Sequence, residues 1–92
     1  MTQYLHQGKA YNQRKVIADL IAQQYRLNDQ AFQRGTFRVR GDSLEIWPAT
    51  LDDRAWRLSF FGEELESIVE FDPLTGARTD TFGRVRIYAN SH

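Results

Sequence analysis

Two arginines stand at alternate positions in the stretch RGTFRVRGDSLEIWP, residues 34–48. Arg38 and Arg40 belong to a run in which apolar and polar residues alternate, as they do in a β-strand with one buried face. Successive side chains of a strand point to opposite faces, so both arginines share one face. A guanidinium group carries a planar fork of donors that can make paired bonds to carboxylate or phosphate groups. The spacing therefore predicts a surface directed at a partner that carries such groups.

Two classes of partner fit this surface, which also includes Arg57 from the next predicted strand. Arginines interleaved with the aromatic residues Trp47 and Phe61 could bind the phosphates and stack the bases of a single-stranded nucleic acid. A protein partner tolerates mixed charges, and arginine and tryptophan dominate the energetics of many protein interfaces. The acidic residues nearby would repel a polyanion. These features favour a protein partner and leave single-stranded nucleic acid as the alternative.

The chain offers no convergent set of catalytic residues. His6 falls in a predicted linker and His92 at the end of the chain. Gly8-Lys9 lacks the glycine-rich approach of a phosphate-binding loop. The carboxylates of the segment 63–70 are more typical of a solvated strand edge than of an acid–base pair or a magnesium site. We therefore expect no enzymatic activity, no cofactor, no bound metal and no small-molecule substrate.

Composition and charge describe a single small domain. The 92 residues include 41% hydrophobic and 13% aromatic residues, enough to fold one modest core. Twelve basic and twelve acidic residues cancel, which argues against a surface that is basic all over. The absence of cysteine and of a signal peptide fits a cytoplasmic location. No run of apolar residues is long enough to span a membrane.

The first third of the chain predicts a linker followed by one helix. Residues 1–11 are polar and contain a glycine, which predicts a linker or a flexible lead-in. Asn12 is a suitable N-cap for a helix over residues 13–26. The apolar residues recur at intervals of three and four, which predicts one buried stripe. The stripe consists of Val16, Ile17, Leu20, Ile21 and Tyr25.

From residue 37 onward the apolar period changes to two, which predicts a first β-hairpin. Gly41-Asp42 fits a two-residue type II′ turn, because glycine allows the positive φ that its first position needs. That turn pairs Arg40 with Ser43 and Arg38 with Glu45. It also pairs Val39 with Leu44 and Phe37 with Ile46. Both apolar pairs then fall on one face and both arginines on the other.

A second hairpin is predicted around Gly62-Glu63. Strict alternation places Trp56, Leu58, Phe60, Leu65, Ser67, Val69 and Phe71 on one face. The opposite face then receives Arg57, Ser59, Phe61, Glu64, Glu66, Ile68 and Glu70. The segment 72–76 is a turn by composition, and residues 85–88 form a last strand. The whole pattern predicts an α+β fold over residues 12–92, with the helix on one face of a small curved antiparallel sheet built from hairpins.

The segment QYRLNDQAFQRGTFRVRGDSLEIWPA, residues 24–49, resembles the second domain of the UvrB family, the helicase-like subunit of bacterial nucleotide excision repair. The resemblance continues in RKVI at 14–17, FFGEELESI at 60–68, FDPLTGA at 71–77 and IYANSH at 87–92. The transcription-repair coupling factor has a similar module, but FDPLTG and the NSH ending look more like UvrB. The resemblance covers nearly the whole chain, and the abrupt end predicts a domain excised from a longer protein.

This resemblance implies a domain that lies outside the ATPase motor and docks onto UvrA. DNA would then be reached only indirectly, through the full-length protein. The family contacts that match here are Arg38, Arg40 and Arg57. Arg26, Glu45 and Ser59 are weaker candidates for the same partner. The chain departs from the family pattern at Leu27, where arginine is usual, and at Ser59, where an acid is usual.

Overall fold

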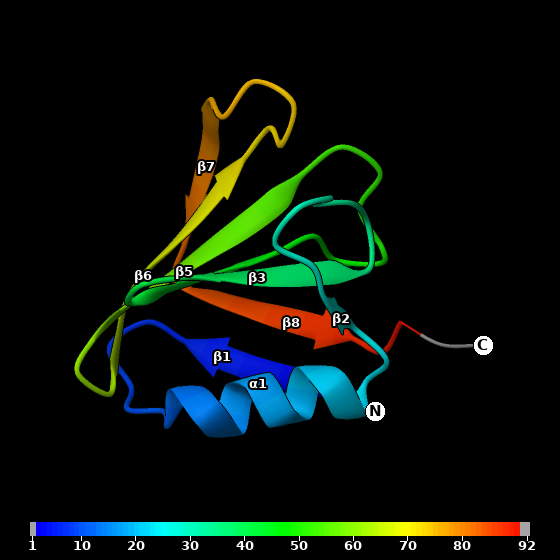
Figure 1. Ribbon diagram of the computed structural model, residues 1–92. Helices are drawn as coiled ribbons and strands as arrows, with labels where there is room; N and C mark the ends of the chain where they lie inside the picture. Colours follow the sequence, from blue (N-terminus) through cyan, green and yellow to red (C-terminus); the bar gives the residue numbers. More distant parts are fainter. Residues whose placement is uncertain (1, 91–92) are drawn as a thin grey trace.

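The computed structural model describes residues 2–90, and within them the chain forms one helix and eight strands. The helix is α1 (Gln13–Ala22). The strands are β1 (Thr2–His6), β2 (Arg26–Leu27), β3 (Thr36–Arg40), β4 (Ser43–Ile46), β5 (Ala55–Phe61), β6 (Glu64–Phe71), β7 (Arg78–Phe82) and β8 (Arg84–Tyr88). One sheet has the order β2-β3-β4-β5-β6-β7, and β1 pairs with β8 in a separate two-stranded ribbon (Figure 1).

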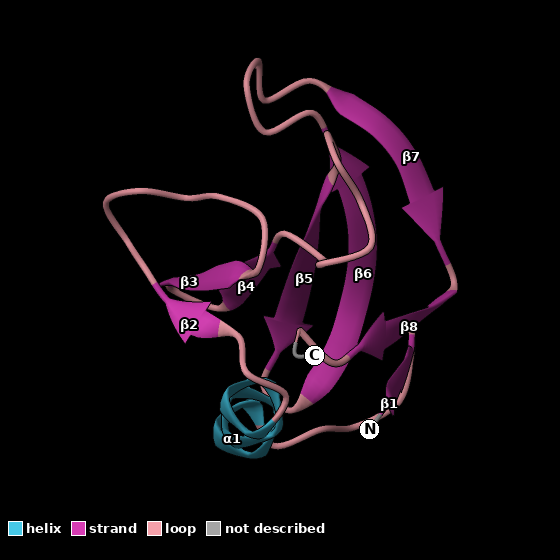
Figure 2. Ribbon diagram, turned by 90° about the vertical axis from the view of Figure 1, so that its right-hand side faces the viewer, coloured by secondary structure: helices cyan, strands magenta, loops and turns pink. Residues whose placement is uncertain are grey.

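The six-stranded sheet curves around one hydrophobic core, which α1 and the β1–β8 ribbon close. Figure 2 shows the sheet bending from β2 to β7, with α1 and the ribbon beneath it. The core side chains of the sheet include Phe37, Leu44, Leu58 and Ile68, which are fully buried. We call this side the inner face of the sheet and the opposite side its outer face. The predicted α+β fold with a small curved sheet is confirmed.

Helix α1 begins where the sequence predicts and ends four residues early. The side-chain oxygen of Asn12 accepts hydrogen bonds from the backbone N–H groups of Arg14 and Lys15, at 2.9 and 3.3 Å. The helix stops at Ala22, and Gln24 takes a positive φ of 74° that redirects the chain. Tyr25 therefore reaches the core from outside the helix. Its hydroxyl donates to the carbonyl of Tyr88 at 2.9 Å.

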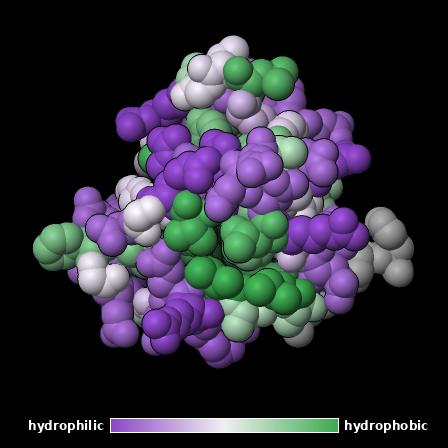
Figure 3. Space-filling model, in the orientation of Figure 1, coloured by the Kyte–Doolittle hydropathy of each residue, from purple (hydrophilic) through white to green (hydrophobic). Residues whose placement is uncertain are grey.

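Helix α1 does not cover the inner face of the sheet completely. Figure 3 shows apolar side chains gathered at the surface between α1 and β3, with polar residues around them. Ile21, predicted to be buried, is 56% exposed, and Leu27 on β2 is 58% exposed. A helix of ten residues is too short to cover the curved edge of the sheet, so these side chains lie at the rim of the core.

The first hairpin has the predicted register at all four pairs. Phe37 pairs with Ile46, Arg38 with Glu45, Val39 with Leu44 and Arg40 with Ser43. Gly41 has a φ of 58°, and Asp42 has no positive φ, which agrees with a type II′ turn. The arginines of β3 therefore point to the outer face, opposite the buried Phe37 and Leu44.

The second hairpin contains a β-bulge that reverses the predicted faces of β6 from Ser67 onward, whereas Leu65 lies in the core as predicted. Ser59 pairs with Ser67, but Phe60 pairs with Leu65, which leaves Glu66 as an extra residue. A one-residue shift moves every following side chain to the other face. Ile68 therefore lies in the core, where the alternation had placed it outside. Phe71 joins the face of Arg57, where the alternation had placed it inside.

The prediction that residues 1–11 form a linker or flexible lead-in is wrong. Residues 2–6 form β1, which pairs antiparallel with β8 from Thr2–Tyr88 to His6–Arg84. Leu5 is fully buried in the core. Only one side chain of this strand is deeply buried, so the segment is mostly polar and shows no strand pattern. His92 and the last part of the NSH block lie outside the described residues.

Candidate functional site

Three charged residues form one row across the outer face of β3, β4 and β5. Arg38 pairs with Glu45 in the β3–β4 register, and Glu45 pairs with Arg57 in the β4–β5 register. All three side chains point away from the core, because their neighbours Phe37, Leu44 and Leu58 are buried on the inner face. We call this row, together with Arg40 on the same strand as Arg38, the arginine face.

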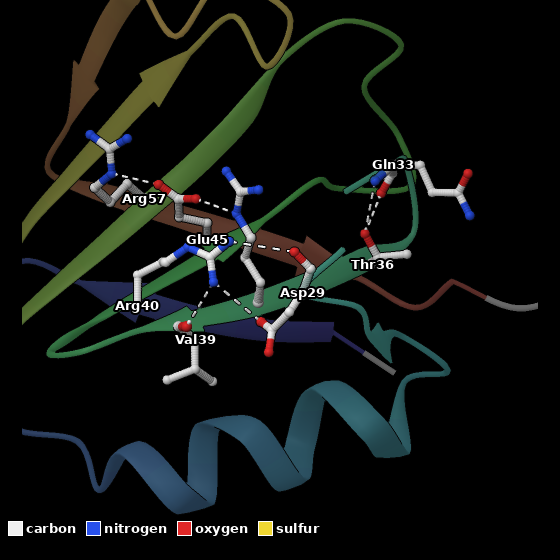
Figure 4. Close-up of polar contacts among 8 residues, drawn as sticks. Asp29, Gln33, Thr36, Val39, Arg40, Glu45 and Arg57 are labelled. Carbon is white, nitrogen blue, oxygen red and sulfur yellow. Dashed lines mark hydrogen bonds and ion pairs between the residues drawn. The ribbon is translucent and has the colours of Figure 1, made fainter. Parts of the chain in front are cut away.

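Glu45 is the centre of the arginine face. Its side chain is only 6% exposed, and each of its oxygens accepts one hydrogen bond. Arg38 Nε donates to Oε1 at 2.6 Å. Arg57 Nε donates to Oε2 at 2.8 Å (Figure 4). Burial would raise the pKa of Glu45, but the hydrogen bonds and charges of Arg57 and Arg38 outweigh it and lower the pKa. Glu45 is therefore an anion at neutral pH.

The two flanking arginines keep most of their donors for another molecule. Within residues 2–90, the hydrogen bonds of Arg38 and Arg57 use Nε alone. The side chains are 24% and 41% exposed, so their terminal nitrogens reach the surface. Glu45 thus holds both guanidinium groups in place by one edge and leaves the outer edge open. This arrangement fixes the position of the donors before any partner arrives.

Aromatic rings pack against the guanidinium groups of Arg38 and Arg57. The guanidinium carbon of Arg38 lies 4.3 Å from the ring centre of Phe32, and that of Arg57 lies 4.9 Å from the ring centre of Phe71. The rings of Phe32 and Phe71 are stacked, with centroids 6.4 Å apart, and Trp47 packs on Phe32 at 5.8 Å. Such cation–π contacts orient both arginines further.

Sequence reasoning missed Phe32 and Phe71 as part of this surface. Phe32 lies in the loop between β2 and β3, where no periodicity indicates a direction. Phe71 was placed on the inner face, because the bulge at Glu66 leaves no signal in a simple alternation. Trp47 was expected to be available for stacking. Instead its ring nitrogen donates to the carbonyl of Leu51 at 2.9 Å, and its ring packs on Phe32.

Arg40 is held more loosely than the other two arginines. Its Nη1 lies 3.4 Å from a carboxylate oxygen of Asp29 and 3.4 Å from the carbonyl of Val39, and its Nη2 lies 3.5 Å from the backbone carbonyl of Asp29 (Figure 4). These distances are near the limit of a hydrogen bond. The side chains of Arg40 and Asp29 are 48% and 57% exposed. Arg40 is therefore free to exchange Asp29 for an acceptor on a partner.

The weaker candidates occupy three different environments. Glu45 is too deeply buried to be a main contact and acts by positioning its neighbours. Ser59 lies on the outer face, with its hydroxyl 3.3 Å from that of Ser43. Arg26 is exposed on β2 and pairs with Thr36 at the edge of the sheet. The structure thus brings Arg38, Glu45 and Arg57 into direct contact and places Arg26 at the rim.

Other kinds of site have little support in residues 2–90. No group of three or more histidine, aspartate or glutamate side chains is arranged to hold a metal ion there. In that same range no helix is long and apolar enough to cross a membrane. The exposed guanidinium donors of the arginine face fit recognition of acceptor groups on another molecule.

Comparison with known protein families places this chain beside one group of domains. The family model described as UvrB interaction domain matches residues 4–92, nearly the whole chain. The match includes both hairpins and all of the ribbon except Thr2 and Gln3, so it covers the arginine face completely.

Proposed function

Because this chain belongs to the UvrB interaction domain family, we propose that it is a non-enzymatic module that docks onto UvrA through the arginine face. The family places the chain among protein-interaction domains of nucleotide excision repair. UvrA is the partner that the resemblance of the FRVR and FDPLTG segments implies. Through this contact the module would bring a UvrB-type subunit to DNA damage.

The observation that carries the proposal is the row Arg38–Glu45–Arg57. Two guanidinium groups are fixed by a shared buried carboxylate and by aromatic rings, and their terminal nitrogens reach the surface. Fixed donors bind carboxylate or carbonyl groups of a protein with little loss of side-chain entropy. Arg40 adds a third donor that can move from Asp29 to the partner. These features support a partner surface that carries acidic and carbonyl acceptors.

Binding of single-stranded nucleic acid fits the arginine face less well. A buried anion lies at the middle of the row, between the two arginines that would bind phosphates. The ring of Phe71 is only 3% exposed and that of Phe32 is partly buried, so neither offers a large open surface for base stacking. Both features favour a protein partner with mixed charges on this face.

Calorimetric titration of the chain with UvrA tests the proposal. The double variant Arg38→Glu, Arg40→Glu should lower the affinity by about thirtyfold or more, the loss of roughly 2 kcal/mol expected for central arginine contacts. Arg14→Glu, which changes an exposed arginine of α1 on the other side of the core, is the matched control and should bind as the wild type does.

Arg38→Glu also places a second carboxylate beside Glu45, so the fold of the double variant must be verified by circular dichroism. The single variant Arg40→Glu avoids this problem, because the contacts of Arg40 are long and exposed. Wild-type affinity in a folded double variant, or in Arg40→Glu together with a folded Arg57→Glu, would refute the assignment of the partner to this face.

A further inference from the structure

The β1–β8 ribbon carries a second surface with a different chemistry. Alternation along both strands buries Leu5, Val85 and Ile87 in the core. The intervening residues point outward and form adjacent rungs of the ribbon. In order along the ribbon these are Tyr88, then Tyr4 opposite Arg86, then His6 opposite Arg84. We call this set of five residues the ribbon face.

The ribbon face forms a shallow hollow of about 400 Å³, lined by its five residues and Val85. None of these lining residues is acidic. The whole chain has as many acidic as basic residues, so a hollow with two arginines and no carboxylate is a local concentration of positive charge. Such a concentration attracts an anionic ligand.

Aromatic rings alternate with the charges of the ribbon face. The guanidinium carbon of Arg86 lies 4.9 Å from the ring centre of Tyr4 and 5.8 Å from that of Tyr88. Arg86 also donates to the hydroxyl of Tyr88 at 2.9 Å. The two tyrosines are 55% and 43% exposed, so a large part of each is open to a ligand. Arginines and exposed rings in one track are the combination that binds single strands through phosphates and bases.

We propose that the ribbon face binds single-stranded nucleic acid, with Arg84 and Arg86 at phosphates and the rings of Tyr4 and Tyr88 against bases. The arginine face and the ribbon face lie on opposite sides of the shared core, because each is the outer side of a layer whose inner side packs into it. The module can therefore hold a protein and a nucleic acid at once. DNA would then be contacted directly, beyond the indirect contact implied by the family resemblance.

An acidic protein segment is the competing ligand of an acid-free surface. It would use the same arginines and would have no need of the exposed rings. Single-stranded nucleic acid is favoured because two exposed rings stand within the charged hollow, where bases can stack while phosphates are neutralised.

Fluorescence anisotropy with the complete chain tests the proposal. Labelled oligothymidylate and oligouridylate should bind at low salt, and affinity should fall as salt rises with a slope of about −1.4 for two phosphate contacts. Polyglutamate of equal charge is the control ligand that lacks bases, and it should bind more weakly than the oligonucleotides. The proposal is overturned by no binding of either oligonucleotide at low salt, or by equal binding of polyglutamate.

Two pairs of variants separate the charges from the rings. Arg84→Ala with Arg86→Ala should lower the affinity about tenfold and flatten the salt dependence. Tyr4→Leu with Tyr88→Leu should also lower it about tenfold while leaving the salt slope unchanged. Arg78→Ala, an exposed arginine on β7, is the matched control and should change affinity by less than about twofold.

An NMR titration of the wild-type chain with oligothymidylate makes the test independent of variant folding. Amide shifts should move in β1 and β8. Shifts confined to β3, β4 and β5 would place the nucleic acid on the arginine face and overturn the proposal.

Discussion

The two exposed faces of this domain use the same side chain in different ways. On the sheet, Arg38 and Arg57 are tied to Glu45, which is almost completely buried. On the ribbon, Arg86 contacts two exposed tyrosines, and the hollow around it has no carboxylate. The rings under the sheet arginines come from the loop before β3 and the end of β6, whereas those of the ribbon lie on the same two strands.

The difference shows that the surroundings of an arginine decide which partner it suits. A shared carboxylate fixes the direction of two guanidinium groups and reduces their net charge, which suits specific acceptors on a protein. An acid-free surface keeps its full charge, which suits a polyanion whose contacts need less exact placement. The following changes should affect the two faces unequally.

The largest effect is expected from Glu45→Gln. The variant removes the charge that holds both arginines, so we expect unfolding free energy to fall by about 2 kcal/mol and UvrA affinity by about tenfold. Urea unfolding and calorimetry would measure the two quantities. Glu63→Gln, in the exposed turn between β5 and β6, should change unfolding free energy by less than about 0.5 kcal/mol. Equal stability of the two variants would contradict the claim that Glu45 holds both arginines in place.

Removing a ring on each face should give unequal losses of stability. Phe32→Ala leaves Arg38, Trp47 and Phe71 without a shared partner, so we expect a loss of about 1.5 kcal/mol. Tyr4→Ala removes an exposed ring and should cost about 0.5 kcal/mol. Thermal and urea unfolding of both variants under one condition would measure the difference. A larger loss for Tyr4→Ala would contradict the claim that the rings of the arginine face are packed more firmly than those of the ribbon face.

Low pH should reduce the stability that Glu45 contributes to the arginine face. The folded pKa of this carboxyl is lowered, so the folded chain binds its proton less readily than the unfolded chain does. Its contribution to stability is therefore present above the ordinary glutamate range, near pH 4.3, and is lost as the pH falls through the folded value. The stability difference between wild type and Glu45→Gln should shrink as the pH is lowered from 7 to about 3. A difference that grows with acid would contradict the assigned ion pairs.

The smallest effect is expected from restoring the family pattern at the edge of the arginine face. Ser59→Glu adds the acid that the family resemblance implies on the strand of Arg57, and Leu27→Arg replaces an exposed apolar residue two positions before Asp29. Each should raise UvrA affinity by about two- to threefold, as contacts at the rim of an interface do. Calorimetry of each single variant would check this, and a loss of affinity would show that these positions meet a different surface here.

The first hairpin was predictable from its sequence, and the second was predictable only in part. In the first, Gly41-Asp42 and the alternation of Phe37 and Val39 agree on one register, so the outward direction of Arg38 follows from local information. In the second, the bulge at Glu66 depends on how β6 packs across the curved sheet. Alternation alone cannot indicate such a shift, which is why Phe71 was assigned to the wrong face.

Long-range contacts account for the other differences. Residues 2–6 form strand β1 because they pair with β8 at the far end of the chain. The segment itself has only one deeply buried residue, Leu5, so local alternation could not predict it. The carboxylate of Glu45 lies between arginines that are 7 and 12 residues away in sequence. The hairpin registers placed all three on one face, but only the structure shows that Glu45 is buried and holds both arginines by one edge.

The most direct test keeps a positive charge on each side of Glu45 and removes only the guanidinium groups that reach the surface. Arg38→Lys with Arg57→Lys retains two positive charges beside Glu45 but loses the planar donors that reach the surface. Arg84→Lys with Arg86→Lys makes the same change on the ribbon face. Calorimetry with UvrA should show about a tenfold loss for the sheet pair and less than a twofold change for the ribbon pair. Equal affinities of the two folded variants would contradict the claim that the arginine face is the docking surface.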